Sequence, residues 1–268
     1  MPPMVTQTAA EWRLLDFSSD SVFHNLAFEE AVARSACSPE FTPSVRVWVN
    51  PPSVILGRFQ QITAEVDVKL CEQRGIQIAR RFTGGGAVYH DEGNLNFTIV
   101  IRTQERPAPN EFQKLGSSII MDTLSGLGLE GSLFPPNSFL LGKRKVAGAA
   151  TAFGKNFALW HSSILVSTDI RMLEEVLAPS KNTNVTGYVR SRWLPVTSLQ
   201  GALKSHLEAI DLKKLLVASA EKILGQKLRI GRVRNDEVKL SDHLYTQKYA
   251  LPEWNQIGTC ETVPRITV

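Results

Sequence analysis

Cysteine is scarce in this sequence, and the chain has neither a long apolar run nor a large excess of charge of one sign. The three cysteines, Cys37, Cys71 and Cys260, form no CxxC pair and no spacing typical of a metal site. Their odd number and the lack of a secretory signal predict a protein of the reducing cytoplasm. No stretch approaches the roughly 18 apolar residues that a membrane helix needs, so no association with a membrane is expected.

Charge is balanced along most of the chain. The net charge is only +4, with 21% charged residues, and basic residues are mixed with acidic ones, so binding to nucleic acid is not expected. The most basic window, residues 227–234, is interpreted either as a solvated strand and turn or as a docking patch for an acidic protein partner. Residues 1–10 contain neither the charged nor the apolar part of a signal peptide and are predicted to be disordered.

Strand and helix patterns are mixed along the 268 residues without a strict strand–helix–strand rhythm. This arrangement predicts an α+β fold with a mixed, largely antiparallel sheet flanked by helices. The length is compatible with one domain, or with one large and one small lobe. One helix is predicted from Thr63 to Arg74, with Gly75 as its stop.

Two hairpins and one linker are predicted from turn residues and polarity. Asp91-Glu92-Gly93-Asn94 is a turn signal, so residues 95–102 are predicted to return as a hairpin strand after residues 87–89. A second hairpin is predicted at Gly142-Lys143, which separates two short strand patterns. Residues 181–199 are polar and irregular, which is typical of a mobile linker or loop.

Three consecutive glycines preceded by two arginines, Arg80-Arg81-Phe82-Thr83-Gly84-Gly85-Gly86, form the most informative segment. Glycine has no Cβ, so the backbone can adopt positive φ and turn its N–H groups toward a ligand. Arginine supplies fixed positive charge and forked donors that match phosphate or carboxylate oxygens. An isolated triplet is more typical of a tight turn. Strand patterns on both sides, at residues 76–78 and 95–101, favour an anion-binding loop on a rigid scaffold.

The segment from Arg80 to Phe97 reads RRFTGGGAVYHDEGNLNF and resembles the motif of the lipoate–protein ligase A family, which is related to lipoyl and octanoyl transferases. Further segments agree with this family in order. They are Asn25-Leu26-Ala27 with Glu29-Glu30, Ile55–Gln60 with Glu65-Val66, Lys145–Ala150, Lys248-Tyr249, and Glu253-Trp254-Asn255. The resemblance extends over roughly residues 11–256.

The resemblance implies a fold like that of biotin ligases and class II aminoacyl-tRNA synthetases, with one catalytic domain over residues 11–268. It implies that lipoate and ATP give lipoyl-AMP and pyrophosphate, and that a lysine amine of an apo lipoyl domain then accepts the lipoyl group. The implied acceptors are E2 subunits of 2-oxoacid dehydrogenases and the H protein of glycine cleavage. The chain resembles the shorter members of the family, so a separate accessory protein is expected.

The resemblance also assigns roles to individual residues. ATP or adenylate binding is implied for Arg81, Gly86, Ala87, Val88, Tyr89 and Lys145. Lipoate binding is implied for Thr83, Gly84, Gly85, His90, Lys145 and His161, with Glu65 and Asn96 as weaker candidates. Lys145 is the expected catalytic residue, because a fixed ammonium would stabilise charge that develops on phosphate and acyl oxygens. Candidates for an apolar wall along the acyl chain, each also typical of a core, are Trp48, Ile55, Leu56, Phe97 and Ile164.

Some departures from the family pattern bear on the chemistry. Ala147 stands where the family usually has serine, and Pro136-Asn137-Ser138 stands where ligases typically have Asn-Asp. The missing acid leaves the ligands of Mg²⁺ open, although Mg²⁺ is expected with ATP, held largely by phosphates and water. Residues 131–144 contain no cysteine, which disfavours the covalent mechanism of cysteine-dependent octanoyl transferases.

Three other functions stay open at this point. One is an octanoyl or lipoyl transferase that uses an acyl-carrier-protein thioester without ATP, which adenylate formation would distinguish. Another is a non-catalytic lipoate-binding module, which an unchanged function in Lys145→Ala would support. The third is a biotin ligase, although the alternating Gly-Arg loop of that family is absent.

Overall fold

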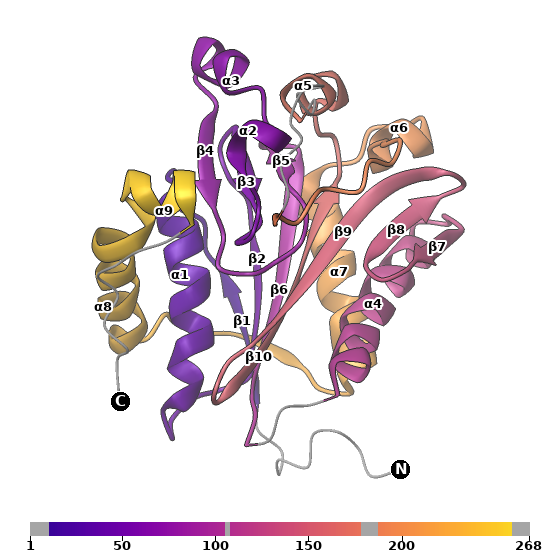
Figure 1. Cartoon of the computed structure of the whole chain (residues 1–268). Coiled ribbons are helices and arrows are strands. Elements are labelled where there is room, and N and C mark those ends of the chain that lie inside the picture. The colour runs from indigo at the N-terminus through magenta and orange to yellow at the C-terminus, as the bar shows by residue number, and fades with distance from the viewer. Residues whose placement is uncertain (1–10, 105–107, 178–186, 259–268) are drawn as a thin grey trace.

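A computed structural model describes residues 11–104, 108–177 and 187–258 of the chain (Figure 1). The predicted disorder of residues 1–10 lies outside this described part. The fold is α+β, as predicted, and its main component is an eight-stranded sheet with the order β11-β1-β2-β6-β10-β9-β8-β7. Its strands are β1 (Trp12–Asp16), β2 (Ser44–Trp48), β6 (Asn94–Arg102), β7 (Gly131–Phe134), β8 (Ser138–Leu141), β9 (Arg144–Phe153), β10 (Phe157–Leu165) and β11 (Leu228–Ile230). Strand β1 runs parallel to β2 and β11, and the other neighbours in this sheet are antiparallel.

A smaller sheet has the order β4-β3-β5 and consists of β3 (Ser53–Leu56), β4 (Gln77–Arg80) and β5 (Val88–His90). Helices lie on both sides of the large sheet (Figure 1). The helices of the described residues are α1 (Val22–Arg34), α2 (Ile62–Glu65), α3 (Val68–Arg74), α4 (Pro109–Gly126), α5 (Ile170–Val176), α6 (Leu199–Leu203), α7 (Ala209–Leu224), α8 (Asn235–Leu244) and α9 (Pro252–Ile257), with a 3₁₀ turn at Ser35–Cys37 and a π-helical turn at Tyr245–Tyr249. In the described part of the chain, none of these helices combines the length and the apolar character needed to cross a membrane.

Alternation of side chains along β6 and β10 gives the large sheet two different faces. Odd-numbered residues 95–101 of β6 and Trp160 of β10 join the main core, which α4 and α7 cover. Asn96 and Thr98 of β6, and His161 of β10, belong to the opposite face, which α1 contacts. The two central strands therefore present polar side chains to a protein interior rather than to water.

Helix α4 lies very close to β10 because residue 116 is glycine. A Cβ atom at Gly116 would stand 2.2 Å from Cδ2 of Trp160. The Trp160 ring is fully buried and meets Phe97 edge-on, with 6.3 Å between the ring centroids. Glycine within a helix costs about 1 kcal/mol relative to alanine. Packing against the indole therefore overrides helix propensity at this position.

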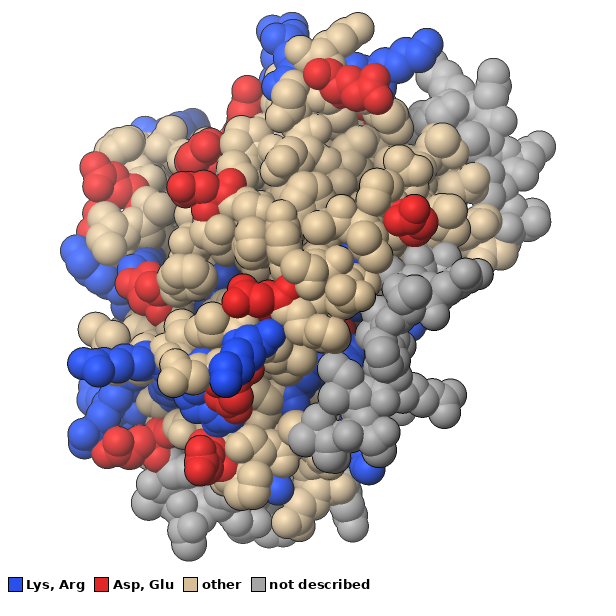
Figure 2. All heavy atoms as spheres, turned by 90° about the vertical axis from the view of Figure 1, so that its left-hand side faces the viewer, with Lys and Arg blue, Asp and Glu red and all other residues tan. Residues whose placement is uncertain are grey.

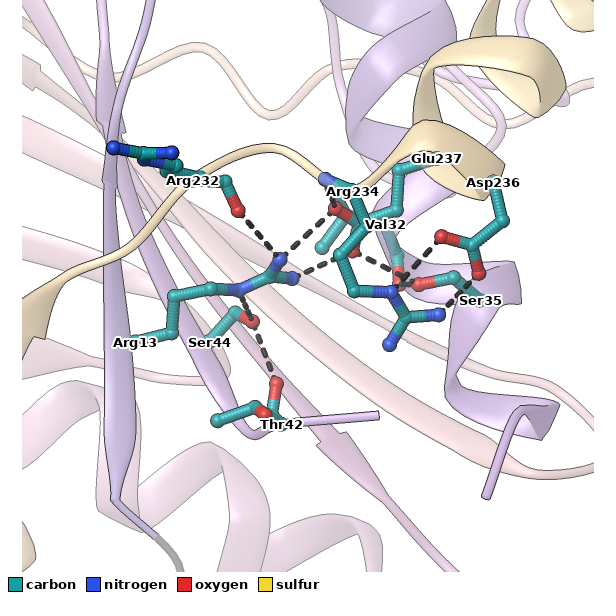
Figure 3. A network of polar contacts seen from close by, with 9 residues as sticks. All are labelled: Arg13, Val32, Ser35, Thr42, Ser44, Arg232, Arg234, Asp236 and Glu237. Carbon is teal, nitrogen blue, oxygen red and sulfur yellow. Dashed lines mark hydrogen bonds and ion pairs between the residues drawn. The ribbon is translucent and has the colours of Figure 1, made fainter. Parts of the chain in front are cut away.

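A buried ion pair joins the first strand to the C-terminal helices (Figure 3). Arg13 Nη2 contacts Glu237 Oε1 at 2.6 Å, and Arg13 Nη1 donates to Glu237 Oε2 at 2.9 Å. Ser35 Oγ donates to the same carboxylate, and Ser44 Oγ accepts from Arg13 Nε. The bidentate geometry and the added hydrogen bonds offset part of the cost of burying both charges. This contact fixes α8 against β1 and α1.

The basic window at residues 227–234 forms ion pairs within the chain. Its salt bridges are Lys227–Glu221, Arg229–Glu11 and Arg234–Asp236. On the face that carries α1 and α8, basic and acidic side chains are interspersed (Figure 2). The structure therefore favours the interpretation of this window as a solvated strand and turn.

The prediction of a single helix over residues 63–74 is wrong, because two short helices, α2 and α3, occupy this range. Val66 between them has an extended backbone, and Asp67 caps α3 by accepting a hydrogen bond from the Leu70 N–H. The Asp67 N–H donates to the carbonyl of Val176 at 3.0 Å, a contact that a continuous helix would lose. Gly75 ends the helix, as predicted, and the structure shows it in the left-handed conformation.

The hairpin predicted between residues 87–89 and 95–102 is also wrong. Strand β5 pairs with β3 in the small sheet, while β6 lies between β2 and β10 in the large one. The turn itself forms, and the Asp91 carboxylate accepts from the N–H groups of Gly93 and Asp169. This turn carries the chain from one sheet to the other. The hairpin predicted at Gly142-Lys143 is confirmed as the antiparallel pair β8–β9.

Candidate active site

Two adjoining cavities lie between the small sheet and the polar face of the large sheet. The first cavity has a volume of about 240 Å³ and is lined by parts of α1, β2, β6, β10 and the glycine loop. The second cavity has a volume of about 310 Å³ and is lined by parts of β5, β9, β10, α5 and residues 190–196. The residues common to both linings are Ala87, Val88, Lys145, Gly148, Ser163, Arg190, Ser191 and Arg192. One binding region is therefore divided into two compartments.

Close packing and one arginine determine the shape of the glycine loop. Gly85 has a φ of +94°, and a Cβ atom at Gly57 would stand 2.0 Å from the carbonyl oxygen of Gly85. Arg81 Nη2 donates to the carbonyls of Gly84 and Gly86 at 2.7 and 2.8 Å. Burial, together with the charge of Arg80, lowers the pKa of Arg81 to about 10, so its guanidinium stays cationic at neutral pH.

Arg80 has a structural role that is distinct from that of Arg81. Its side chain is fully buried and donates to the carbonyls of Gly57, Gln60 and Trp254. The Arg80 N–H donates to Asn255 Oδ1. Because these bonds join β4, the turn after β3 and α9, the first arginine of the motif fixes the C-terminal segment beside the glycine loop.

Lys145 lies where the two cavities meet. Residues 195–197 fix its backbone at the start of β9, because the Lys145 N–H donates to the carbonyl of Pro195 and the Lys145 carbonyl accepts from the Thr197 N–H. Its side chain extends over Gly148, where a Cβ atom would stand 2.7 Å from Nζ. Within the described part of the chain, no hydrogen bond or ion pair engages Nζ. Burial, with a smaller contribution from Arg81, lowers the pKa of Lys145 to about 8.

A chain of buried hydrogen bonds connects the glycine loop to the sheet. Thr83 Oγ1 accepts from Arg81 Nε at 2.9 Å and contacts His161 Nε2 at 3.0 Å. His161 Nδ1 contacts Glu29 Oε1 at 2.9 Å, and Thr98 donates to the same oxygen at 2.6 Å. Although burial opposes ionisation, His161 and the hydrogen bond from Thr98 lower the pKa of Glu29. The loop conformation is thereby coupled to a carboxylate of α1.

The structure distributes the predicted ligand-binding residues between the two compartments. Gly85, His90, Lys145 and His161, among the predicted lipoate-binding residues, line the first cavity, whereas Thr83 and Gly84 line neither. Ala87, Val88, Tyr89 and Lys145, among the predicted nucleotide-binding residues, line the second cavity, whereas Arg81 and Gly86 line the first. Of the apolar wall candidates, Trp48 and Ile55 line the first cavity, and Leu56, Phe97 and Ile164 lie in hydrophobic cores.

Two parts of the site were not predicted from the sequence. One is Glu29, whose signal was the pair of acidic residues Glu29-Glu30 between the apolar residues of α1. The other is the segment 181–199 predicted as a mobile linker, whose described part, residues 187–199, is instead held against the site. Ser191 Oγ accepts from the Ala87 N–H and from Gln60 Nε2, both at 2.9 Å, and Ser191 N–H donates to Glu65. No local periodicity marks this segment, because its order comes from contacts distant in sequence.

Metal ligands are sparse in the described residues. No group of three or more His, Cys, Asp or Glu side chains there has a geometry that could hold a metal ion. Two carboxylates, Glu65 and Glu174, line the second cavity, and Glu65 is paired with Arg190 at 3.2 Å. Cys71 is buried away from both cavities, and burial raises its pKa to about 11. This thiol is therefore unsuited to act as a nucleophile.

Residues 21–221 match the family described as "Lipoyl protein ligase A/B catalytic domain". Over 244 residues the chain is 32% identical to "Lipoate-protein ligase A subunit 1" of Thermoplasma acidophilum, and the aligned part covers 86% of this chain and 90% of the relative. A solved structure of "a bi-partite lipoate protein ligase and its E2 lipoyl domain" from Thermoplasma acidophilum is similar with a TM-score of 0.83 and 29% identity, covering 95% of this chain and 99% of that chain. A structure of "lipoate-protein ligase A bound with ATP" is similar with a TM-score of 0.81 and 30% identity, covering 92% and 98% of the two chains.

Proposed function

The chain belongs to the lipoyl protein ligase A/B catalytic domain family, and from this premise we propose that it is an ATP-dependent lipoate–protein ligase. The observation that carries the proposal is the position of Lys145 between two cavities. A reaction that joins two substrates needs two compartments that meet at the reacting atoms. A cationic group at the meeting point is suited to two anions, a carboxylate and a triphosphate.

In the first step, lipoate lies in the first cavity with its carboxylate at Lys145, and the α-phosphate of ATP approaches from the second cavity. A carboxylate oxygen attacks the α-phosphorus, the bond to the β-phosphate oxygen breaks, and pyrophosphate leaves. The Lys145 ammonium contacts the oxygens on which negative charge accumulates. Since few other groups neutralise its charge, its interaction with the transition state is strong.

In the second step, a lysine amine of the acceptor attacks the acyl carbonyl of lipoyl-AMP. The carbon–oxygen bond to AMP breaks, and AMP leaves as the amide forms. Lys145 stabilises the oxyanion of the intermediate and the phosphate of the leaving group. Positioning and charge account for catalysis without a covalent enzyme intermediate. Gly85 and Gly86 allow the ligand to approach the loop backbone closely.

The proposal includes the partners of the reaction. The acceptors are apo lipoyl domains of E2 subunits and H protein, and a separate accessory subunit assists the chain, as expected from the relatives named "subunit 1" and "bi-partite". The reaction takes place in the cytoplasm. Mg²⁺ accompanies ATP and neutralises phosphate charge, and phosphates and water supply most of its ligands.

Pyrophosphate release from ATP in the presence of lipoate tests the proposal, with the chain alone and with an accessory subunit. Mass spectrometry identifies lipoyl-AMP and the lipoylated acceptor. Lys145→Ala is expected to abolish both products. Lys143→Ala is the matched control, because Lys143 is an exposed lysine in the turn just before β9 and is expected to leave the rate unchanged.

Two results would redirect the assignment. Octanoyl transfer from a carrier-protein thioester in the absence of ATP, without pyrophosphate release, would indicate a transferase. Lipoate binding that persists with no transfer under any condition would indicate a binding module.

A further inference from the structure

Three buried polar atoms at the first cavity have no hydrogen-bond partner within the described residues. They are Glu29 Oε2, His90 Nε2 and Asn96 Nδ2, three of the five such side-chain atoms in this part of the chain. Their side chains line the first cavity and are only 1%, 4% and 3% exposed. Native proteins contain few unsatisfied polar groups, because leaving a buried donor or acceptor unpaired is unfavourable. Their concentration at one cavity indicates a place for a ligand atom that can form hydrogen bonds.

Trp48 brings these three side chains together. Asn96 is its partner across the β2–β6 pairing, and the His90 ring meets the indole edge-on with 6.5 Å between centroids. Trp48 Nε1 donates to Thr98 Oγ1, which in turn donates to Glu29 Oε1. The three side chains with unpaired atoms are therefore grouped around Trp48 rather than scattered over the cavity.

A chain of hydrogen bonds determines which nitrogen of His90 carries the proton. Arg46 Nη2 donates to Asn25 Oδ1 at 3.0 Å, and Asn25 Nδ2 donates to Asn50 Oδ1 at 2.9 Å. Asn50 Nδ2 contacts His90 Nδ1 at 2.9 Å. Because a guanidinium can only donate, both amide orientations follow from Arg46, and His90 Nδ1 must accept. The Nε2 atom of His90 therefore carries the hydrogen and acts as a donor.

The imidazole of His90 remains neutral at physiological pH. Burial, with a contribution from the charge of Arg81, lowers the pKa of His90 to about 3. The carboxylate of Glu29 adds negative charge at the same end of the cavity, opposite in sign to Lys145. An acid that enters the cavity is thus oriented with its carboxyl group toward Lys145 and its tail toward His90, Asn96 and Glu29.

We propose that His90 and Asn96 donate hydrogen bonds to a sulfur atom of the dithiolane ring and thereby select lipoate over acids with a plain hydrocarbon tail. The inference rests on the proposed function. A sulfur atom is a weak acceptor, but it can pair with a buried N–H group that otherwise has no partner. An octanoate tail offers only methylene groups and leaves both donors unsatisfied. Arg46, Asn25 and Asn50 are positioning residues in this arrangement, since they act through His90.

Calorimetric binding of three acids to the full chain tests the proposal. The acids are lipoate, octanoate and 5-cyclopentylpentanoate, which keeps the ring and chain of lipoate but replaces both sulfurs with carbon. The wild-type chain is expected to bind lipoate about 100-fold more tightly than the cyclopentyl acid, which corresponds to about tenfold for each of the two buried donors. Equal affinities for these two acids would overturn the proposal.

Variants then separate hydrogen bonding from the shape of the cavity. His90→Phe and Asn96→Leu each remove one donor and are expected to reduce the lipoate preference by about tenfold, without weakening binding of the cyclopentyl acid. Asn50→Asp keeps the shape of the side chain, but its carboxylate oxygen can only accept a hydrogen bond from His90 Nδ1. The hydrogen therefore moves from Nε2 to Nδ1, and the preference for lipoate over the cyclopentyl acid is expected to fall. Ile55→Val is the matched control, since it shortens an apolar side chain of the cavity lining and is expected to weaken the binding of all three acids to a similar extent.

A uniform loss of affinity for all acids in the His90 and Asn96 variants would overturn the proposal. Two donor variants are included so that one that fails to fold does not leave the question open. Pyrophosphate release is measured on the same samples. A wild-type chain that discriminates among the acids but releases no pyrophosphate would contradict the ligase function and leave the selectivity mechanism intact.

Discussion

Replacing Gly85 with alanine tests whether the shape of the glycine loop supports activity. Gly85 has a φ of +94°, and a Cβ atom there would stand 2.9 Å from Arg81 Nη2. Backbone strain at such a position costs about 1–3 kcal/mol. The displaced arginine would also lose its hydrogen bonds to the carbonyls of Gly84 and Gly86. We therefore expect Gly85→Ala to lower the free energy of unfolding by about 1–3 kcal/mol.

The loss of activity should exceed the loss of stability. A displacement of about 1 Å near reacting groups can reduce the rate about 100-fold. We expect a decrease of this size in kcat/KM for lipoate. It is measured by pyrophosphate release in the absence of denaturant, under conditions in which the variant is folded. Urea titration of the same sample gives the free energy of unfolding.

The neighbouring glycine provides the control. A Cβ atom at Gly84 would meet only two ring carbons of Phe59, at the ordinary contact distance of 3.9 Å, and Gly84 does not have a positive φ. Gly84→Ala is therefore expected to change the free energy of unfolding by no more than about 0.5 kcal/mol and to keep kcat/KM close to the wild-type value. Equal losses in both variants, or full activity in Gly85→Ala, would refute the steric reasoning.

Four further predictions follow from the burial and charge of individual groups. Burial and Arg81 lower the pKa of Lys145 to about 8, and its cation is the active form, so kcat/KM should fall as the pH rises through about 8; a constant rate up to pH 10 would contradict this. Glu237→Gln removes the charge that compensates Arg13 and should lower the free energy of unfolding, measured in urea, by about 3–5 kcal/mol. A double variant with apolar residues at both positions should recover this free energy, and a failure to recover it would argue against an electrostatic cause. Gly116→Ala should lower the free energy of unfolding by about 1–3 kcal/mol, because the added methyl group clashes with Trp160. An increase in the free energy of unfolding would mean that α4 can move to accommodate the methyl group. Burial disfavours the charged form of Glu30, but Lys248 and Arg34 outweigh it and lower its pKa below 4.5. The stability it contributes is thus complete above pH 4.5 and lost as the pH falls through the folded-state pKa, and Glu30→Gln should flatten this part of the stability curve; an unchanged curve would contradict that assignment.

Local sequence patterns were sufficient where the determinants of structure are close together in the chain. The end of α3 at Gly75 and the hairpin at Gly142 depend on the conformational freedom of glycine within a few residues. The alternation along β10 likewise follows from the geometry of a strand. Predictions failed where distant contacts decided the outcome. The Asp67 N–H bonds to Val176 and interrupts the helix, and the Asp91 turn sends β6 into a different sheet because β2 and β10 pair with it there.

The sequence by itself determined the α+β class and the glycine loop with its two arginines, because the strand and helix patterns and the loop motif are formed by residues that are close together in the chain. It also predicted Lys145 as the catalytic residue, from a specific motif. Only the tertiary structure decided that Arg80 binds α9 while Arg81 shapes the loop, since the last side chain of β4 and the one that follows it enter different surroundings. Only the tertiary structure brought Glu29, His90 and Asn96, from α1, β5 and β6, to one cavity. Hydrogen bonds and burial depend on distances in space, and no local pattern in a chain encodes which remote side chains will meet.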